Sequence, residues 1–120
     1  MDRLLVRLGR HAVSRGEIWI ATGGVYTSKP RPALILQDDR FDGTDSVTVC
    51  PLTSTDIPLP LLRVPVPVDQ VSGLDTPSWV MVDKITTIRR SHVAKFVGRL
   101  SAAQLVDVER LLLVFLGMAR

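Results

Sequence analysis

The prolines around Arg31 constrain the fold of this 120-residue chain, because proline fixes φ and removes a hydrogen-bond donor from a β-ladder. Pro30 and Pro32 flank Arg31 directly before the apolar run Ala33-Leu34-Ile35-Leu36, which has the character of a buried strand. We therefore expect Arg31 at the start of that strand and not in mid-sheet. There it presents a permanent cation whose planar guanidinium matches the geometry of a phosphate.

Short apolar segments recur along the chain, as is typical of β-strands. We expect strands near residues 18–21, 32–37, 46–51, 62–68, 79–82, 85–88 and 95–99. Pro65 and Pro67 interrupt the fourth of these, which must lie at a sheet edge or carry a bulge. Ser101 and Gln104 form a capping box that opens a helix, which Gly117 can end. Several strands followed by one closing helix predict an α+β fold, a small and strongly bent antiparallel sheet or barrel.

Length and composition indicate one globular domain, with 46% hydrophobic and 22% charged residues. Residues 1–14 are basic and amphipathic, and we expect a flexible extension before a domain at 15–120; a partner-binding or membrane-surface helix is the alternative. No apolar run reaches the roughly 20 residues of a membrane span. We expect Cys50, the single cysteine, to be buried in the core, and we expect the protein to act in the reducing cytoplasm. The two histidines are too far apart in sequence to match the spacing of a zinc site.

The C-terminal helix is apolar almost all round in its final turns, unlike a helix with one face in water. Either the domain wraps it completely or a second subunit covers it. We favour a homodimer, with Leu112, Phe115 and Leu116 in the interface.

The order of several short motifs resembles the MazF/PemK family of toxin endoribonucleases, over approximately residues 15–117. The motifs are Arg15-Gly16-Glu17-Ile18-Trp19-Ile20, Lys29-Pro30-Arg31-Pro32, Pro51-Leu52-Thr53-Ser54 and Val82-Asp83-Lys84-Ile85-Thr86-Thr87-Ile88. The resemblance implies an SH3-like barrel, a dimer with clefts for single-stranded RNA, and neutralisation by a small antitoxin. It also implies cleavage without metal or cofactor by the RNA 2′-hydroxyl, leaving a 2′,3′-cyclic phosphate and a 5′-hydroxyl.

The same resemblance assigns roles to three residues. It makes Arg31 the contact to the scissile phosphate and Thr53 the second catalytic position, with Ser54 as its neighbour. Asp83 is a candidate for the base or for holding the arginine, although Met81 stands where a family subgroup has an arginine. Without the resemblance, we would expect Arg31 to be a solvated cation on the surface and Thr53 to be a structural residue at a strand end. Asp83 would then form an ion pair with a nearby cation.

RNA also needs contacts to its backbone and bases. Lys29 and Lys84 are our candidates for backbone contacts, and Tyr26 is a candidate for base stacking. There is no phosphate-cradling glycine loop, nucleophile elbow or dense carboxylate cluster, so metal-dependent nuclease chemistry is disfavoured.

Two other functions fit the same fold. One is a non-catalytic toxin that binds gyrase, as toxins of the CcdB type do, and the other is an inactive family member retained as a regulator. The RNA sequence that is cut and the identity of the antitoxin do not follow from one sequence.

Overall fold

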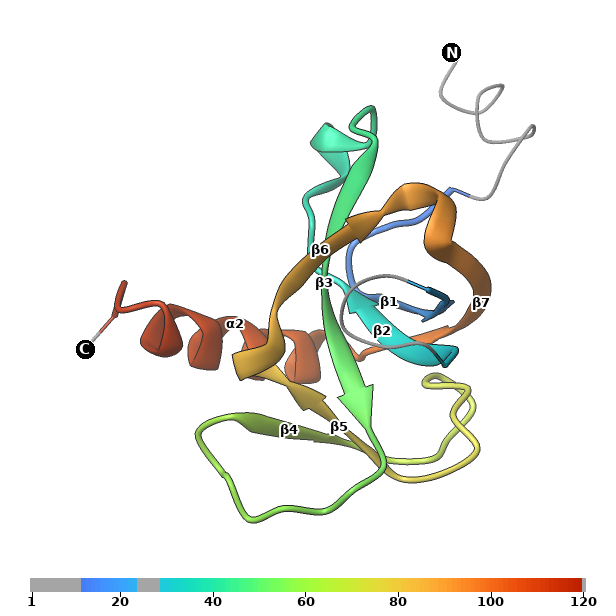
Figure 1. The fold of residues 1–120 in the computed structure, drawn as a ribbon. Helices are drawn as coiled ribbons and strands as arrows, with labels where there is room; N and C mark the ends of the chain where they lie inside the picture. Colours follow the sequence, from blue (N-terminus) through green and yellow to red (C-terminus); the bar gives the residue numbers. More distant parts are fainter. Residues whose placement is uncertain (1–11, 24–28, 120) are drawn as a thin grey trace.

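The computed structural model of the chain describes residues 12–23 and 29–119. These described residues form seven strands, three short 3-10 helices and one α-helix (Figure 1). The strands are β1 (Glu17–Ala21), β2 (Arg31–Ile35), β3 (Ser46–Thr53), β4 (Arg63–Val66), β5 (Ser78–Met81), β6 (Thr86–Arg89) and β7 (Val93–Arg99). The 3-10 helices are η1 (Asp39–Phe41), η2 (Val82–Lys84) and η3 (Arg90–His92), and the α-helix is α2 (Ala102–Phe115).

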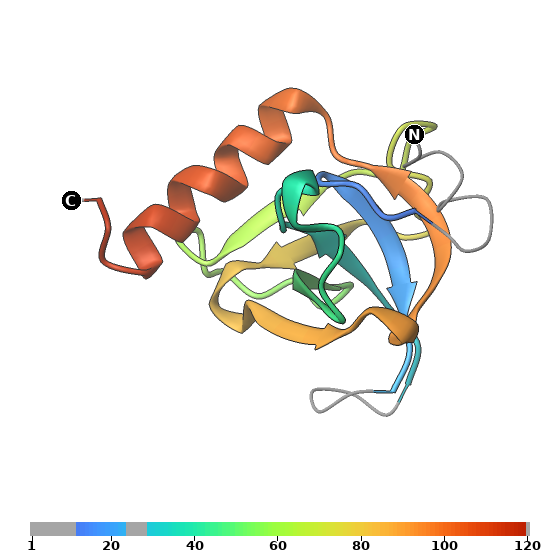
Figure 2. The ribbon, with the colours of Figure 1, turned by 90° about the horizontal axis from the view of Figure 1, so that it is seen from above.

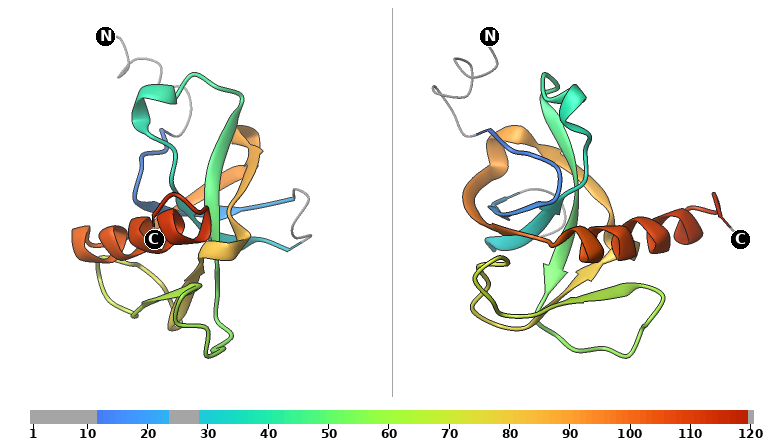
Figure 3. Two further views of the ribbon diagram at one scale, coloured as in Figure 1. Left: turned by 90° about the vertical axis from the view of Figure 1, so that its left-hand side faces the viewer. Right: turned by 180° about the vertical axis from the view of Figure 1, so that it is seen from behind.

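The strands form one antiparallel sheet in the order β4-β5-β3-β2-β1-β7, with β6 paired to β3 outside this path. The long strand β3 pairs with β6 through Ser46–Val49 and with β5 through Leu52 and Thr53. The 3-10 helix η2 separates β5 from β6, and the sheet bends where β3 passes from one of these strands to the other (Figures 1 and 3). The predicted α+β class and bent antiparallel sheet are confirmed, although strand pairing does not close the sheet into a barrel.

The prolines of β2 and β4 lie near a strand end and at a sheet edge, where a missing N–H is tolerated. The ladder between β2 and β3 begins at Ala33, past both prolines that flank Arg31. Pro65 lies in β4, which is the first strand of the sheet order, so the predicted edge position is confirmed. On β4, Val64 and Val66 are buried and Pro65 is exposed, as period-2 alternation requires.

The central strands bury both of their faces. Ile18 and Leu34 belong to one apolar cluster, under α2, while Trp19 and Ile35 belong to a second cluster on the other face. The predicted burial of Cys50 is confirmed, and it lies in the first cluster.

The helix α2 lies along one side of the sheet (Figure 2) and begins with the predicted capping box of Ser101 and Gln104. Gly117, at φ +75°, ends it, and the Met118 N–H donates to the Leu113 carbonyl as in a Schellman motif. Val108 is fully buried against the core, and the last turns leave a largely bare apolar surface: Leu113, Val114, Phe115 and Leu116 are 43 to 51% exposed. Among the described residues, no helix combines the length and apolar character that crossing a membrane requires.

Candidate functional site

A groove of about 480 Å³ opens where β1, β2, β3 and β7 come together beside the β4–β5 connection. Its lining residues are Ile20, Arg31, Pro32, Leu52, Ser54, Gly73, Leu74, Asp75, Thr76, Ser78, Lys95, Phe96 and Val97. The groove therefore brings together two of the predicted site residues, Arg31 and Ser54.

The floor of the groove is a row of residues that face each other across neighbouring strands. Lys95 of β7 is paired with Ile20 of β1, and Ile20 is paired with Pro32 of β2. The β2–β3 register pairs Ala33 with Pro51, and continuing it by one residue sets Pro32 opposite Leu52. Because directly opposed residues point to the same face of a sheet, the row runs across four strands.

The wall of the groove is the β4–β5 connection, which lies against the end of β7 (Figures 1 and 3). The Arg99 N–H donates to the Val71 carbonyl at 2.9 Å. A Cβ built at Gly98 would lie 2.2 Å from the Ser72 carbonyl oxygen, so only glycine permits this approach of two backbones. The contact fixes the position of the wall relative to β7.

Charge in the groove comes from three side chains: the cations Arg31 and Lys95 and the carboxylate of Asp75. Arg31 and Lys95 are exposed, and neither forms an ion pair or side-chain hydrogen bond with the residues the structure describes. Both cations are therefore available to an anionic ligand, and the lining carries one net positive charge.

Thr53 ends β3 next to the groove and is not among its lining residues. Continuing the β2–β3 register by two residues sets Thr53 opposite Arg31. Its hydroxyl accepts a hydrogen bond from the Thr55 N–H at 3.1 Å, which orders the strand end. Thr53 and Arg31 thus lie on adjacent strand ends, and Ser54 is the hydroxyl of this segment that reaches the groove lining.

Asp83 lies in η2, where the 3-10 turn interrupts the path from β5 to β6. Its carboxylate accepts a hydrogen bond from the guanidinium of Arg63, whose side chain is only 8% exposed. Arg63 is paired across the β4–β5 ladder with Met81, the position where the resemblance would place an arginine. The neighbouring strand therefore supplies the arginine that bonds Asp83. Neither residue lines the groove.

Burial, and secondarily the charge of Asp83, raise the pKa of the Cys50 thiol to about 12. The thiol is therefore protonated at neutral pH, and it is a packing group rather than a nucleophile.

The remaining predicted residues are spread over the molecule. Lys29 and Lys84 are exposed and do not line the groove, and Tyr26 lies outside the described residues. Phe115 and Leu116 are exposed at the end of α2, whereas Leu112 is half-buried and packs on the core.

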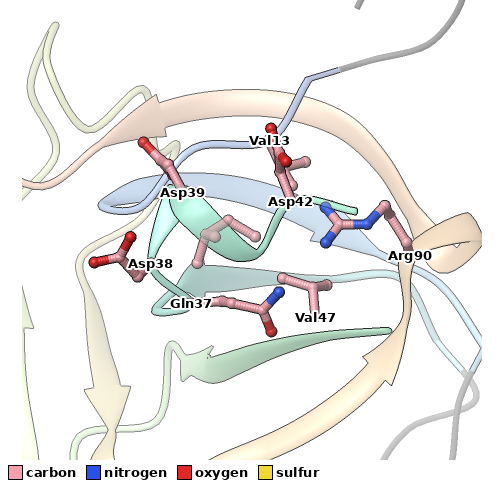
Figure 4. A pocket seen from close by; sticks show the side chains of 8 residues that line it. Val13, Gln37, Asp38, Asp39, Asp42, Val47 and Arg90 are labelled. Carbon is pink, nitrogen blue, oxygen red and sulfur yellow. The ribbon is translucent and has the colours of Figure 1, made fainter. Parts of the chain in front are cut away.

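A second hollow, between η1 and η3, holds about 10 Å³, room for about one water molecule (Figure 4). Its polar groups are bonded within the surrounding loops. Arg90 donates to the Thr44 carbonyl, the Arg15 N–H donates to Asp39, and Asp38 pairs with Arg40 at 3.0 Å. Hydrogen bonds from Arg40 hold the pKa of the Asp38 carboxyl below its usual range. This hollow is part of the loop structure, and the larger groove is the better candidate site.

The sequence analysis missed Lys95 and Asp75 as groove residues. No local motif marks either of them, because Lys95 reaches the groove through its pairing across β1 and Asp75 through the folding of the β4–β5 connection. A reliable strand register would have been the signal for Lys95.

Comparison with known proteins relates the chain to one family. Residues 14–116 match the family described as PemK-like, MazF-like toxin of type II toxin-antitoxin system. A Mycolicibacterium smegmatis protein named probable endoribonuclease MazF is 52% identical over 106 residues, which cover 88% of this chain and 97% of the relative.

Solved structures show the same fold. Mycobacterium tuberculosis toxin MazF-mt6 superposes with a TM-score of 0.73 at 31% identity, covering 87% of this chain and 99% of that one. A mycobacterial endoribonuclease in complex with its cognate antitoxin superposes with a TM-score of 0.74 at 24% identity, covering 91% and 99%.

Proposed function

Because the chain belongs to the PemK-like, MazF-like toxin family of type II toxin-antitoxin systems, we propose that it is an endoribonuclease that cleaves single-stranded RNA in the groove beside Arg31. The observation that carries the proposal is the guanidinium of Arg31, which has no ion-pair partner among the described residues, in a groove that also holds the Ser54 hydroxyl. The 52% identical relative is named a probable endoribonuclease, which supports RNA cleavage as the reaction.

In this proposal the RNA 2′-hydroxyl attacks the adjacent phosphorus and the bond to the 5′-oxygen breaks. The products are a 2′,3′-cyclic phosphate and a 5′-hydroxyl. Arg31 stabilises the charge on the phosphorane and assists departure of the 5′-oxygen, while Thr53 and Ser54 orient the phosphate oxygens. The substrate carries its own nucleophile, so the reaction requires no metal ion or cofactor.

The reaction also needs a group that accepts the proton of the 2′-hydroxyl. Asp83 was the sequence-based candidate, and its bond to Arg63 supports instead the role of holding an arginine. Lys29, Lys84 and Tyr26 remain proposals for contacts to RNA outside the groove.

We also propose a homodimer, a cognate antitoxin as protein partner, and action in the cytoplasm. The apolar end of α2, with Phe115 44% and Leu116 51% exposed, supports a protein–protein contact there. The solved structure of a mycobacterial endoribonuclease with its cognate antitoxin, which has the same fold, supports an antitoxin as the protein partner. Elution of the pure protein as a monomer over a wide concentration range would contradict the homodimer.

The test uses Arg31→Ala and Thr53→Ala on a long, unstructured RNA in excess chelator. Loss of the Arg31 guanidinium should slow cleavage about a hundredfold or more, since such a contact contributes on the order of 2 to 4 kcal/mol at the transition state. Thr53→Ala should also slow cleavage, and Thr53→Ser should retain most of the rate. Arg40→Ala, which removes an exposed arginine outside the groove, is the matched control.

Two results would contradict the proposal. Complete loss of cutting by the wild type on adding chelator would remove the metal-independent mechanism. A folded Arg31→Ala protein that still arrests growth fully would favour the non-catalytic, gyrase-binding alternative.

A further inference from the structure

We propose that Lys95 is a second phosphate-binding residue of the groove, which holds the RNA backbone at a phosphate different from the one bound by Arg31. This inference rests on the proposed ribonuclease function. It adds a residue of β7 to a groove in which the sequence had predicted only Arg31 and Ser54 as site residues.

Strand pairing gives the geometry. Lys95 faces Ile20 and Ile20 faces Pro32, so Lys95 is two strands away from the residue that follows Arg31. Two inter-strand spacings separate their backbones by about 10 Å. Lys95 on β7 and Arg31 on β2 therefore lie two strands apart with β1 between them, so an RNA strand that contacts both must cross the strands of the sheet.

The charges support a phosphate as the ligand. Within the described chain no carboxylate pairs with Lys95 or Arg31, although Asp75 lines the same groove. The other basic residue of β7, Arg99 at the C-terminal end of the strand, is bonded to Glu17 at 3.2 Å. Lys95 is therefore the cation of β7 that is not paired with a carboxylate among the described residues, and a compact ammonium group on a flexible stem suits contact with a phosphate.

The proposal separates the roles of the two cations. Arg31 acts on the scissile phosphate, so its loss should lower kcat. Lys95 acts on a phosphate that does not react, so its loss should weaken binding to the substrate and the transition state equally, and should raise KM with little change in kcat.

The experiment compares Lys95→Gln, Lys95→Arg and the charge-matched control Arg40→Gln. Binding is measured with a mixed-sequence, single-stranded RNA pool carrying 2′-O-methyl groups, which block the nucleophile, between about 50 and 200 mM salt. Cleavage of unmodified RNA gives kcat and KM. Because each neutralised phosphate of a single strand contributes about 0.7 to the slope of log K against log salt, Lys95→Gln should reduce that slope by about 0.7.

We expect a severalfold loss of affinity and a matching rise in KM for Lys95→Gln, near-wild-type behaviour for Lys95→Arg, and an unchanged slope for Arg40→Gln. A Lys95→Gln slope equal to that of the wild type would overturn the inference, as would a fall in kcat at constant KM. If Arg31→Ala is inactive in the same assays, either of these two results for Lys95→Gln would contradict the role of Lys95 but not the ribonuclease function. A wild type that neither binds the pool nor cleaves RNA overturns both.

Discussion

The buried ion pair of Asp83 and Arg63 allows a sharp test of whether Asp83 is a structural or a catalytic group. The Arg63 side chain is 8% exposed and that of Asp83 is 20% exposed. Arg63 Nη1 also donates to the Leu62 carbonyl at 3.1 Å, and its Nε has no hydrogen-bond partner among the described residues. Asp83→Asn would leave a nearly buried guanidinium without its counter-charge.

The expected cost follows from the burial of each partner. Removing one member of a fully buried pair costs roughly 3 to 5 kcal/mol, because the remaining charge stays desolvated. Water can reach part of this pair through the exposed fifth of Asp83, so we expect about 3 kcal/mol for Asp83→Asn. In a domain of this size that corresponds to a fall of about 10 °C in Tm.

Arg63→Met leaves the partly exposed carboxylate, which can hydrate, and should cost less, about 1 to 2 kcal/mol. The double variant has no buried charge, so it should be more stable than the sum of the single losses predicts. We expect a coupling free energy of about 2 kcal/mol in the double-mutant cycle.

Urea unfolding of the four proteins measures these quantities, and RNA cleavage is followed on the same samples. A loss below about 1 kcal/mol for Asp83→Asn, or additivity within about 0.5 kcal/mol, would refute the structural role. Abolished cleavage with unchanged stability would instead identify Asp83 as the catalytic base. Reduced stability with cleavage retained by the folded fraction is the result that the structure predicts.

Two further predictions concern stability. Gly98→Ala should cost about 1 to 3 kcal/mol of unfolding free energy, since its Cβ would meet the Ser72 carbonyl at 2.2 Å, whereas Gly43→Ala, with no atom within 4 Å, should be near neutral in the same melts. The Cys50 thiol should resist alkylation at pH 8 until the protein unfolds. Because the pKa of the thiol is raised in the folded protein, the stability that it contributes is fully present below the pKa of the unfolded thiol. That contribution is lost between about pH 9 and 12, by up to about 1.4 kcal/mol of unfolding free energy per pH unit. Cys50→Ala should lack this pH dependence. Rapid alkylation of the native protein would contradict this.

Local sequence was sufficient to predict the seven strands and the C-terminal helix, but not the 3-10 helices η1 and η2. The run after Pro32 became β2, the prolines of 62–68 marked an edge strand, and Ser101, Gln104 and Gly117 defined the ends of α2. These features act over a few residues, through fixed φ angles, missing N–H groups and capping hydrogen bonds, so the sequence alone is enough to predict them. The boundaries shifted by one or two residues, and the strand predicted at 62–68 shortened to Arg63–Val66, since Pro67 cannot continue the ladder.

The composition of the groove was decided by tertiary structure. Arg31 was recognisable from its flanking prolines, but Lys95 joins it only because β7 pairs with β1 more than seventy residues away in the chain. In the same way, Asp83 found its counter-ion in Arg63 through the β4–β5 ladder and not in the adjacent Lys84 or the nearby Arg89. Which distant residues meet depends on strand order and register, and these are set by the packing of the whole sheet rather than by any local pattern.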